Sequence, residues 1–393
     1  MSRIYLDYNA TTPLRPEALQ AMTEVLAHHF GNPSSVHWAG AEAREDVDRA
    51  RSQVAELMGV EPDAIVFMSS ATEANNTVLR NAALQAPAGG DHIVTCATEH
   101  PSILESLDEL REQGLQTIVL PVGRDGRIDP ERFRDSLNER TLLASIMWAN
   151  NETGIVQPIP ELARIAAEAG VPFHTDAVQA LGKRRLSLGE LPVDFASFSA
   201  HKLGGPKGIG ALYARPGVRF APLLRGGPQE WNRRAGTENV PGIVGFGAAC
   251  AAAARDLEER AQRLGALCDR LWVGLEAKVP DIRCNSPREH SLPHTLNVSF
   301  AGADGEALVE ACDVEEIAVA SGAACHSGSS EPSHVLLAMG VPIELGVGAV
   351  RFSLGPETRV EEIDRVLDVL PGIVECVRGA TRAERDTRQS LRR

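Results

Sequence analysis

The sequence predicts an α/β protein in which a mostly parallel, mixed sheet covered by helices forms a large domain and a smaller α+β domain follows. Short apolar segments, many with β-branched residues, alternate with helical segments over most of the chain, as in βαβ units. These segments are apolar throughout rather than at every second position, so both faces of the sheet should be covered. The expected strands are residues 65–68, 92–96, 116–120, 142–147, 172–174, 195–199 and 210–214.

The boundary of the large domain is expected near a glycine- and proline-rich zone, residues 204–247, and the alanine-rich helical stretch at residues 240–278. Helices are expected between the earlier strands at residues 74–85, 103–113 and 160–169. The smaller unit should contain strands at residues 295–300, 317–320 and 349–352 and helices at residues 305–311, 333–339 and 361–377.

Composition argues against several classes of function. The 393 residues carry a formal net charge of −14, whereas non-specific nucleic-acid binding needs a cationic face. The sequence has neither the run of about 18 apolar residues that a membrane span needs nor the apolar core of a signal peptide at its start. The seven cysteines form no C-x-x-C pair, so we expect free thiols in a reducing, cytoplasmic compartment and no zinc motif.

Lys202 is the first candidate site residue. It follows an expected strand, in the run Ser-Ala-His-Lys that begins at Ser199, and a glycine loop comes next. Ligands of open α/β sheets bind outside the carboxyl ends of the strands, and a lysine there suits a Schiff base with phosphate donors beside it. Taken alone, such a lysine is more often a solvated side chain before a turn.

Asp176 changes that balance because it lies at the end of another expected strand. A carboxylate directly after apolar residues needs a cation or hydrogen bonds, and the pyridinium nitrogen of pyridoxal phosphate is such a cation. Neighbouring strand ends would present Asp176 and Lys202 to one ligand. The alternative role, a helix N-cap, explains Asp176 alone but not the pair.

The run Ser-Ser-Ala-Thr-Glu at residues 69–73 lies between an expected strand and an expected helix. Free N–H groups at the start of a helix bind phosphate well. Alternatively, Ser70 and Glu73 form a capping box. Both interpretations compete for the same N–H groups, and the hydroxyl groups beside the small Ala71 leave room for an anion.

His100 and Arg351 each have a functional and a structural interpretation. His100 precedes a proline and could lie over a cofactor ring and move protons, or be an ordinary loop histidine. Arg351 lies in an otherwise apolar strand and needs a carboxylate, either that of an amino-acid substrate or that of a protein side chain.

Cys325 lies in the most unusual segment of the chain, among glycine, alanine and serine residues. Such surroundings predict an exposed, mobile loop at about residues 321–331, whereas structural cysteines have apolar surroundings. A mobile thiol suits a nucleophile that reaches a substrate and then carries a group away, and the alternative is a plain surface loop. The other six cysteines are expected to be mostly structural.

Together these motifs resemble the cysteine desulfurases, pyridoxal-phosphate enzymes of the class V aminotransferase-like group. The short cysteine loop that leads into His334 is similar to the nitrogen-fixation and housekeeping iron–sulfur branch. The matching runs span nearly the whole chain in the family's order: YLDYNATTP (5–13), GNPSS (31–35), SATE (70–73), TEHP (98–101), NNETG (150–154), DAVQ (176–179), SAHK (199–202) with GPKG (205–208), RAGTEN (234–239) and SGAAC (321–325).

The resemblance implies a fold-type I pyridoxal-phosphate transferase with a large cofactor domain at residues 16–256 and a small domain made of residues 1–15 and 257–393. Lys202 would hold the cofactor as a Schiff base, and Cys325 would be the nucleophile. The resemblance implies that the cofactor ring is contacted by Asp176, Gln179 and His100, and that His100 also transfers protons. The phosphate would be held by Ala71, Thr72, Ser199, His201 and, from a partner subunit, Thr237. The substrate carboxylate would be bound by Arg351 and by Asn151, which would also lie beside the cofactor.

The implied reaction removes sulfur from L-cysteine, giving L-alanine and a persulfide on Cys325. The implied partners are a second copy of the chain, in a homodimer, and an iron–sulfur scaffold protein that accepts the sulfur in nitrogenase or housekeeping service. A selenocysteine lyase or another class V enzyme is the alternative, although the cysteine loop speaks against an aminotransferase. One cysteine cannot hold a cluster alone, so Cys325 is expected as a metal ligand only transiently, shared with the scaffold.

The chain departs from the family's pattern at residues 226–232, GGPQEWN, where relatives often have a third glycine and an Arg-Gly pair. This segment lies near the expected subunit interface. We therefore expect the departure to affect the interface and the choice of partner rather than the chemistry.

Overall fold

The computed structural model describes residues 3–85, 90–321 and 332–391, and it confirms an α/β fold with a mostly parallel, mixed central sheet. The strand order is β2-β8-β7-β6-β5-β3-β4, in which β8 runs antiparallel to both neighbours and the other pairs are parallel. These strands are β2 (Ile65–Met68), β3 (His92–Cys96), β4 (Gln116–Leu120), β5 (Thr141–Ser145), β6 (Phe173–Asp176), β7 (Phe195–Ser199) and β8 (Gly210–Ala214).

The expected strands agree with the structure to the residue at β2, β3, β4, β7 and β8. The expected end of β6 at residue 174 is wrong, because Thr175 and Asp176 continue the strand and pair with Ala196 and Ser197 of β7. Conversely, β5 ends at Ser145, two residues earlier than expected. Both differences arise at the carboxyl edge of the sheet, where polar side chains are buried.

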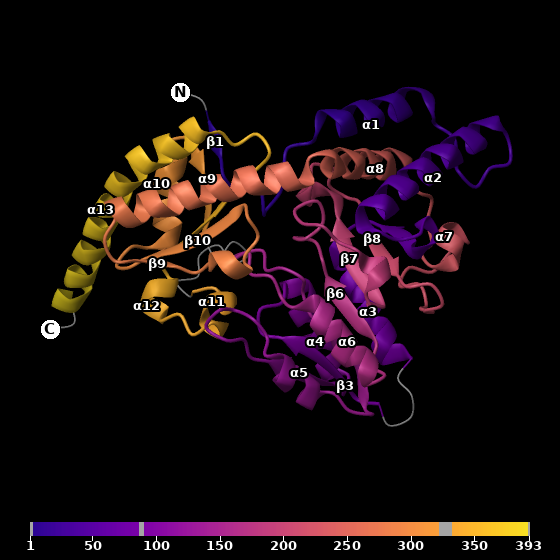
Figure 1. Ribbon diagram of the computed structural model, residues 1–393, viewed down its shortest axis with the longest axis horizontal. Helices are drawn as coiled ribbons and strands as arrows, with labels where there is room; N and C mark the ends of the chain where they lie inside the picture. Colours follow the sequence, from indigo (N-terminus) through magenta and orange to yellow (C-terminus); the bar gives the residue numbers. More distant parts are fainter. Residues whose placement is uncertain (1–2, 86–89, 322–331, 392–393) are drawn as a thin grey trace.

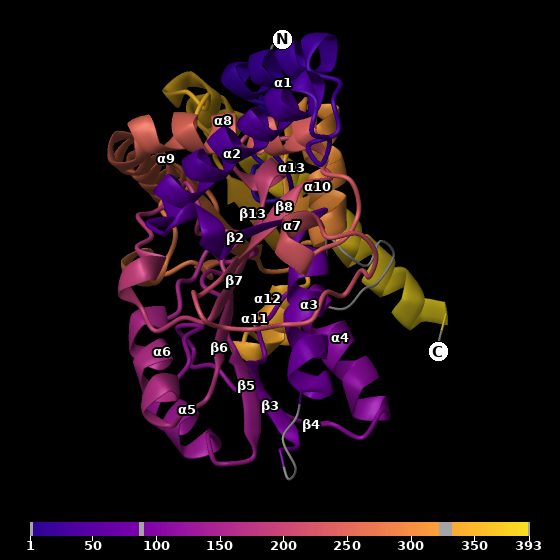
Figure 2. The ribbon, with the colours of Figure 1, turned by 90° about the vertical axis from the view of Figure 1, so that its right-hand side faces the viewer.

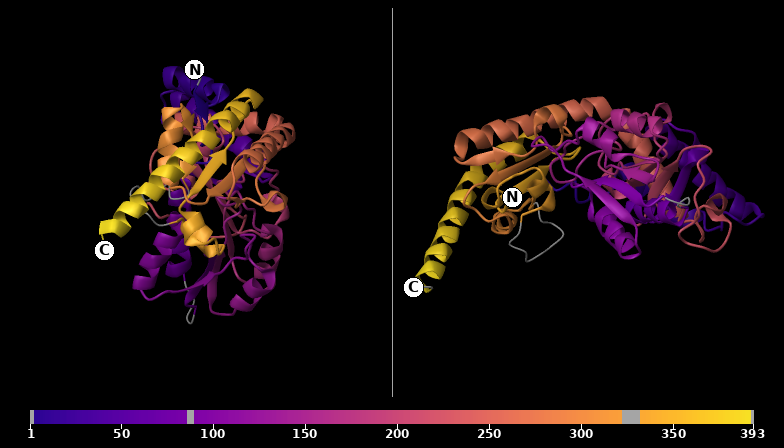
Figure 3. Two further views of the ribbon diagram at one scale, coloured as in Figure 1. Left: turned by 90° about the vertical axis from the view of Figure 1, so that its left-hand side faces the viewer. Right: turned by 90° about the horizontal axis from the view of Figure 1, so that it is seen from below.

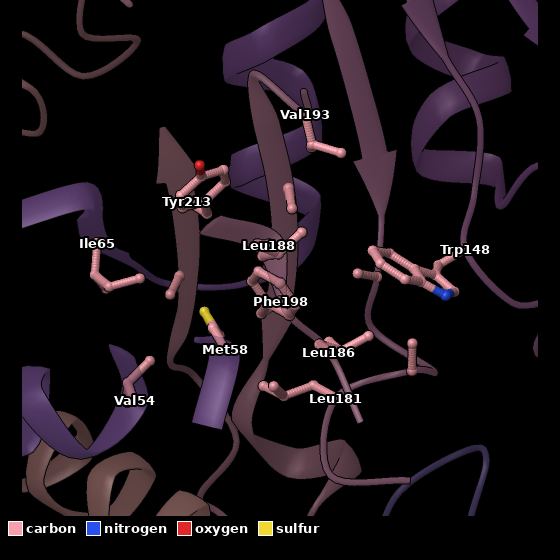
Figure 4. Packing of buried hydrophobic residues seen from close by; sticks show 14 of the residues in the cluster. Val54, Met58, Ile65, Trp148, Leu181, Leu186, Leu188, Val193, Phe198 and Tyr213 are labelled. Atoms are coloured by element: carbon pink, nitrogen blue, oxygen red, sulfur yellow. The ribbon is translucent and has the colours of Figure 1, made fainter. Parts of the chain in front are cut away.

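Helices cover both faces of the sheet, as the continuous apolarity of its strands predicts. In β2, Val66 and Met68 pack in one hydrophobic cluster with α3 and α4, while Ile65 and Phe67 pack in another with α2 and α8. Figure 2 shows α5 and α6 on one side of the strands and α3 and α4 on the other, and Figure 4 shows part of the cluster around Met58 and Phe198. The helices before residue 256 are α1 (Pro16–His28), α2 (Trp38–Met58), α3 (Ala71–Leu84), α4 (Pro101–Glu112), α5 (Pro130–Ser136), α6 (Ile159–Glu168), α7 (Gln229–Asn232) and α8 (Val240–Arg255).

The remaining elements form a second body of structure beside the first (Figure 1). Its sheet has the order β12-β13-β10-β9 and is antiparallel, and its hydrophobic cluster includes Leu271, Phe300 and Phe352. The C-terminal end of the α13 helix extends away from this body (Figure 3), and the helix runs well beyond the expected end at residue 377. These elements are α9 (Leu257–Lys278), β9 (Ile282–Cys284), β10 (Thr295–Phe300), α10 (Gly305–Val314), β11 (Ile317–Ala318), β12 (Ala320–Ser321), α11 (His334–Ala338), α12 (Ile343–Gly346), β13 (Ala349–Ser353) and α13 (Val360–Leu391).

The start of the chain joins this second body. Strand β1 (Ile4–Tyr5) pairs in parallel with β11, and Asp7 forms an isolated bridge with Ser353. The expected strand at residues 317–320 is therefore two strands, because the chain leaves the pair with β1 and enters the antiparallel sheet at Ala320. The division into residues 16–256 and the rest stays a prediction.

The helical stretch expected at residues 240–278 is two helices, α8 and α9, which meet at Asp256 with a bend of 74°. Asp256 has non-helical backbone angles, φ −128° and ψ 20°, and its side chain pairs with Arg260 in the first turn of α9. Among the described residues, no single helix has the length and apolarity to cross a membrane; only this bent pair, taken together, meets that test by length and composition.

Three consecutive residues of α7, Glu230, Trp231 and Asn232, have φ values of 46°, 56° and 64°. Left-handed backbone costs about 1–3 kcal/mol per non-glycine residue unless surrounding contacts enforce it. Here the buried Glu230 carboxylate accepts hydrogen bonds from both terminal nitrogens of Arg51, at 2.8 and 2.6 Å, and from the Phe67 N–H at 2.8 Å. The Arg51 guanidinium also lies 4.6 Å from the ring centroids of Phe67 and Trp231.

We predict that Glu230→Gln lowers the free energy of unfolding by about 3–5 kcal/mol, because it leaves the buried Arg51 cation without its carboxylate and releases the strained turn. Denaturant melts of the purified protein measure this change. The matched control is Glu259→Gln on the exposed side of α9, which should change stability by less than about 0.5 kcal/mol. Equal stability of the two variants would contradict the prediction.

Candidate active site

A cavity of about 290 Å³ lies at the carboxyl edge of the large sheet. Asp176 ends β6, and Lys202 follows β7 in a short 3₁₀ turn, Ala200–Lys202, so two neighbouring strands deliver both residues. The cavity brings together most of the site residues predicted from the sequence. Its lining includes Ala71, Thr72, His100, Asn151, Asp176, Gln179, Ser199, His201 and Lys202.

The Asp176 carboxylate is buried and already oriented by the protein. One oxygen accepts from the Asn75 side-chain amide at 2.9 Å, and the other accepts from the Val178 N–H at 3.1 Å. Asp176 therefore caps a turn, so part of the structural alternative holds. The fully buried Asn75 also donates to Ser102, on the neighbouring helix α4, at 2.9 Å. Asn75 was not predicted from the sequence. The only indication of its role is that a polar residue lies on the buried face of α3.

Lys202 is held by main-chain oxygens from the start of the chain. Its Nζ donates to the carbonyl groups of Asn9 and Ala10, at 2.8 Å each. The same segment reaches His201, whose Nδ1 lies 3.1 Å from the Thr11 hydroxyl. Burial, followed by the charge of Lys202, lowers the pKa of His201 to about 4, so this imidazole is neutral near pH 7. A neutral His201 can still donate one N–H to an anion.

The start of α3 combines both interpretations of residues 69–73. Ser70 accepts from the Glu73 N–H at 3.1 Å, and the Glu73 carboxylate accepts from the Ser69 N–H at 2.7 Å. Within the part of the chain that the structure describes, this capping leaves the N–H groups of Ala71 and Thr72 without an acceptor, since a helix cannot bond its own first donors. Burial would raise the pKa of Glu73, but hydrogen bonds from Arg234 and Ser69 outweigh it and lower that pKa.

A glycine makes room at the same helix end. An added Cβ at Gly210, the first residue of β8, would lie 2.7 Å from the Ser70 carbonyl carbon and 3.0 Å from the Ala71 nitrogen. The close approach of β8 therefore requires glycine. The result is a tight backbone cradle whose helix N–H groups can hold an anion such as phosphate.

His100 is the N-cap of α4, and its Nδ1 accepts from the Ser102 N–H at 3.1 Å. That hydrogen bond assigns the proton of the neutral ring to Nε2. Burial lowers the pKa of His100; the Asp176 charge opposes this effect, while Lys202 and His334 add to it. His100 is thus a neutral imidazole at the cavity wall, fixed in position by its role as a cap.

Arg351 does not line the cavity, although it contacts a residue that does. Its guanidinium pairs with Asp7 at 2.7 Å and donates to the Asn151 carbonyl at 2.9 Å. The protein carboxylate that the sequence left as an alternative is therefore present. Within the described chain, the buried Nε of Arg351 has no hydrogen-bond partner.

The family comparison agrees with this geometry. Residues 4–366 match the aminotransferase class-V family. The chain belongs to that family. A cysteine desulfurase of Cereibacter sphaeroides is 50% identical over 380 residues, which cover 96% of this chain and 97% of the relative. Cysteine desulfurase IscS of Dictyoglomus turgidum is 45% identical over 375 residues and 95% of each chain.

Solved structures extend the class V comparison to three dimensions. A NifS-like protein superposes with a TM-score of 0.90 at 38% identity, covering 95% of this chain and all of that one. A NifS-like protein from Rickettsia africae gives a TM-score of 0.86 at 31% identity, again covering 95% and 100%. The resemblance and the fold expected from the sequence motifs are confirmed.

The cofactor of class V proteins is pyridoxal phosphate, as expected from Lys202 and Asp176. The described residues fit it. Asp176 is a buried carboxylate for a protonated ring nitrogen, and Lys202 is an amine within the same cavity for the aldehyde. The cradle between Gly210 and the start of α3 is suited to the phosphate.

Among the described site residues, Thr237, like Arg351, does not line this cavity. Thr237 is exposed and absent from its lining, as is compatible with a residue that acts on a partner subunit's site. Cys325 lies outside the described residues. Among the other cysteines, Cys96, Cys250, Cys268 and Cys312 are buried, Cys284 is half-buried and Cys376 is exposed.

Glu152, next to Asn151, is a buried residue of this class V site that sequence reasoning missed. Burial raises the pKa of its carboxyl to about 7, against the opposing effects of a hydrogen bond with Ser333 and the charge of Arg351. Asn150 stabilises the turn that carries Asn151. Its side-chain oxygen accepts hydrogen bonds from the N–H groups of Glu152 and Thr153, at 2.9 Å each. Ionisation of Glu152 therefore disfavours the folded state at this turn.

We predict that Glu152→Gln stabilises the protein at alkaline pH and not at acid pH. A carboxyl whose pKa is raised on folding contributes its stability below its unfolded pKa and loses it as the pH rises through about 7. The gain should approach about 3 kcal/mol as an upper limit, because burial raises the pKa of this carboxyl from its ordinary 4.5 to about 7. Melting temperatures of wild type, Glu152→Gln and the exposed control Glu105→Gln at pH values below and above 7 provide the measurement. A pH-independent difference would refute it.

Proposed function

We propose that this protein is a cysteine desulfurase that converts L-cysteine into L-alanine and keeps the sulfur as a persulfide on Cys325. The observation that carries the proposal is the cavity in which Lys202, Asp176 and His100 meet. Support comes from relatives named cysteine desulfurase and from a solved structure, SspA in complex with cysteine, with 31% identity and a TM-score of 0.79. Atoms balance: the substrate's C–S bond breaks, an S–S bond forms, and the alanine methyl group gains a proton.

Each residue of the cavity has a distinct task. When bound, pyridoxal phosphate supplies an electron sink for the substrate's Cα–H bond. Asp176, oriented by Asn75, stabilises the positive charge of a ring nitrogen. Lys202 would anchor the cofactor and, as a free amine, would move the substrate's Cα proton at its Nζ. His100, in the cavity wall with its proton on Nε2, would take part in proton transfer.

The substrate would be oriented by Asn151 and Arg351. Arg351 is fixed by Asp7 and by the Asn151 carbonyl, so the guanidinium is held next to the main chain of Asn151. An α-carboxylate bound there would place the Cα–H bond of cysteine toward Lys202. The thiolate of Cys325 then attacks the substrate sulfur.

Delivery of the sulfur and assembly of the protein belong to the same proposal. The persulfide would pass to an iron–sulfur scaffold protein in the cytoplasm, with Cys325 as a transient ligand of the cargo. A homodimer would add Thr237 of a partner subunit to the phosphate site. Large apolar side chains at the end of α1 and start of α2 are exposed, including Phe30 (81%), Val36 (101%) and Trp38 (67%), as a subunit interface would require.

We predict that Lys202→Ala abolishes the visible absorption band of the bound cofactor and lowers alanine formation by more than about 10²-fold. Cys325→Ser should retain the absorption band and lose persulfide formation, because only the sulfur acceptor is removed. Cys376→Ser, at the exposed cysteine of the described residues, is the matched control and should keep full activity. Wild-type activity in either of the first two variants would overturn the assignment of that residue.

The proposed homodimer can be tested by measuring the molecular mass of the protein in solution. Sedimentation equilibrium at micromolar concentration should give twice the chain mass of 42.1 kDa, because a monomer would leave the apolar side chains around Phe30 in water. Phe30→Asp combined with Trp38→Asp should produce monomers. A fully active monomer of wild-type protein would contradict the proposal.

A further inference from the structure

Lys183 is a lysine close to the site that the mechanism above does not use. It lies four residues after Gln179, in the turns that follow β6. Its Nζ donates to the Gln179 side-chain oxygen at 2.5 Å and lies 3.5 Å from the side-chain oxygen of Asn9. On the other side of the same amide, Gln179 Nε2 donates to the main-chain oxygen of Asn9 at 3.1 Å.

These contacts select one of the two orientations of the Gln179 amide. An amide presents an acceptor oxygen and a donor NH₂ group, whereas a lysine nitrogen offers donors to whatever it faces. Lys183 therefore keeps Oε1 on its own side, and a carbonyl keeps Nε2 on the opposite side. One Nε2 hydrogen goes to Asn9, and the second remains for a ligand in the cavity that Gln179 lines.

The position of Lys183 is electrostatically costly. Burial, and then the charges of Lys202 and Arg351, lower the pKa of Lys183 well below its ordinary value. His201 and His294 also feel its charge, and burial keeps both of these imidazoles neutral. A buried cation beside two other cations destabilises the fold unless its contacts serve the site, and perturbed lysines gather at functional sites for this reason.

We propose that Lys183 is a positioning residue of the cofactor site, which locks the Gln179 amide so that its Nε2–H faces the ring oxygen of the cofactor. This inference rests on the proposed contact between Gln179 and that ring. Through the locked amide, Lys183 stabilises negative charge on the ring oxygen.

The locked amide acts in one direction on the bound cofactor. A donor on the ring oxygen withdraws charge that would otherwise hold the proton shared with the Lys202 nitrogen. Removing Lys183 should therefore raise the pH at which the absorption band of the resting holoenzyme changes, by roughly one unit, the size of one hydrogen bond.

The experiment is an absorption titration of purified holoenzyme without substrate. Lys183→Met removes the nitrogen and keeps the length, Lys183→Arg restores a donor, and Arg185→Met, in the adjacent exposed turn, is the matched control. We expect an upward shift of the titration midpoint in Lys183→Met, rescue in Lys183→Arg and no shift in Arg185→Met. Cofactor dissociation, followed by gel filtration, should be roughly tenfold faster in Lys183→Met alone.

A second variant separates this inference from the function on which it rests. Gln179→Leu should shift the midpoint in the same direction, and adding Lys183→Met to it should cause little further shift, because both residues act through one amide. A shift in Gln179→Leu with none in Lys183→Met would overturn the role of Lys183 and leave the cofactor site intact. A wild-type protein without cofactor absorption would instead refute the proposed function.

Discussion

The hydrogen bonds of the Asn9 main-chain oxygen hold the site together. This one atom accepts from Lys202 Nζ at 2.8 Å and from Gln179 Nε2 at 3.1 Å. Its own side chain reaches Thr295 and His294, each at 2.9 Å, in the second body of structure. Because a buried amine is stable only with acceptors, the reactive lysine depends on a segment that is 193 residues away in sequence.

That dependence explains why the first residues of the chain belong to the site. Strand β1 pairs with β11, Asp7 holds Arg351, and the carbonyl groups of Asn9 and Ala10 hold Lys202. One short segment thus spans from the arginine proposed for the substrate carboxylate to the lysine that anchors the cofactor. Any shift of the second body relative to the large sheet would therefore change the contacts of both the arginine and the lysine.

The sequence predicted those features of the site that depend on local sequence patterns. Apolar runs that stop at polar residues indicated the strand ends before Asp176 and Lys202 and the helix start after Ser70, and the structure brings these residues to one cavity. The sequence offered His100 as a ring contact or a loop histidine, and its role as the N-cap of α4 was not predicted. Asn75, Asn9, Lys183 and Glu152 have no such local signal. Their environments are created by tertiary contacts, for example between Asn75 and Asp176, 101 residues apart. The bend at Asp256 was missed for the same reason, since alanine-rich composition favours helix on both sides of it.

Residues 226–232, where the chain departs from the family's pattern, make hydrogen bonds that explain what this segment does in the fold. Glu230 binds the Phe67 N–H, and Arg51, its ion-pair partner, donates to the Ile65 carbonyl, so the segment braces β2 along its length. Farther on, Arg234 holds Glu73, whose carboxylate in turn accepts from the Ser69 N–H. The chain between β2 and α3, whose helix N–H groups suit the phosphate, is therefore braced on both sides by this part of the chain. Substitutions within residues 226–232 consequently act on the phosphate end of the site through strand β2, in addition to any effect at a subunit interface.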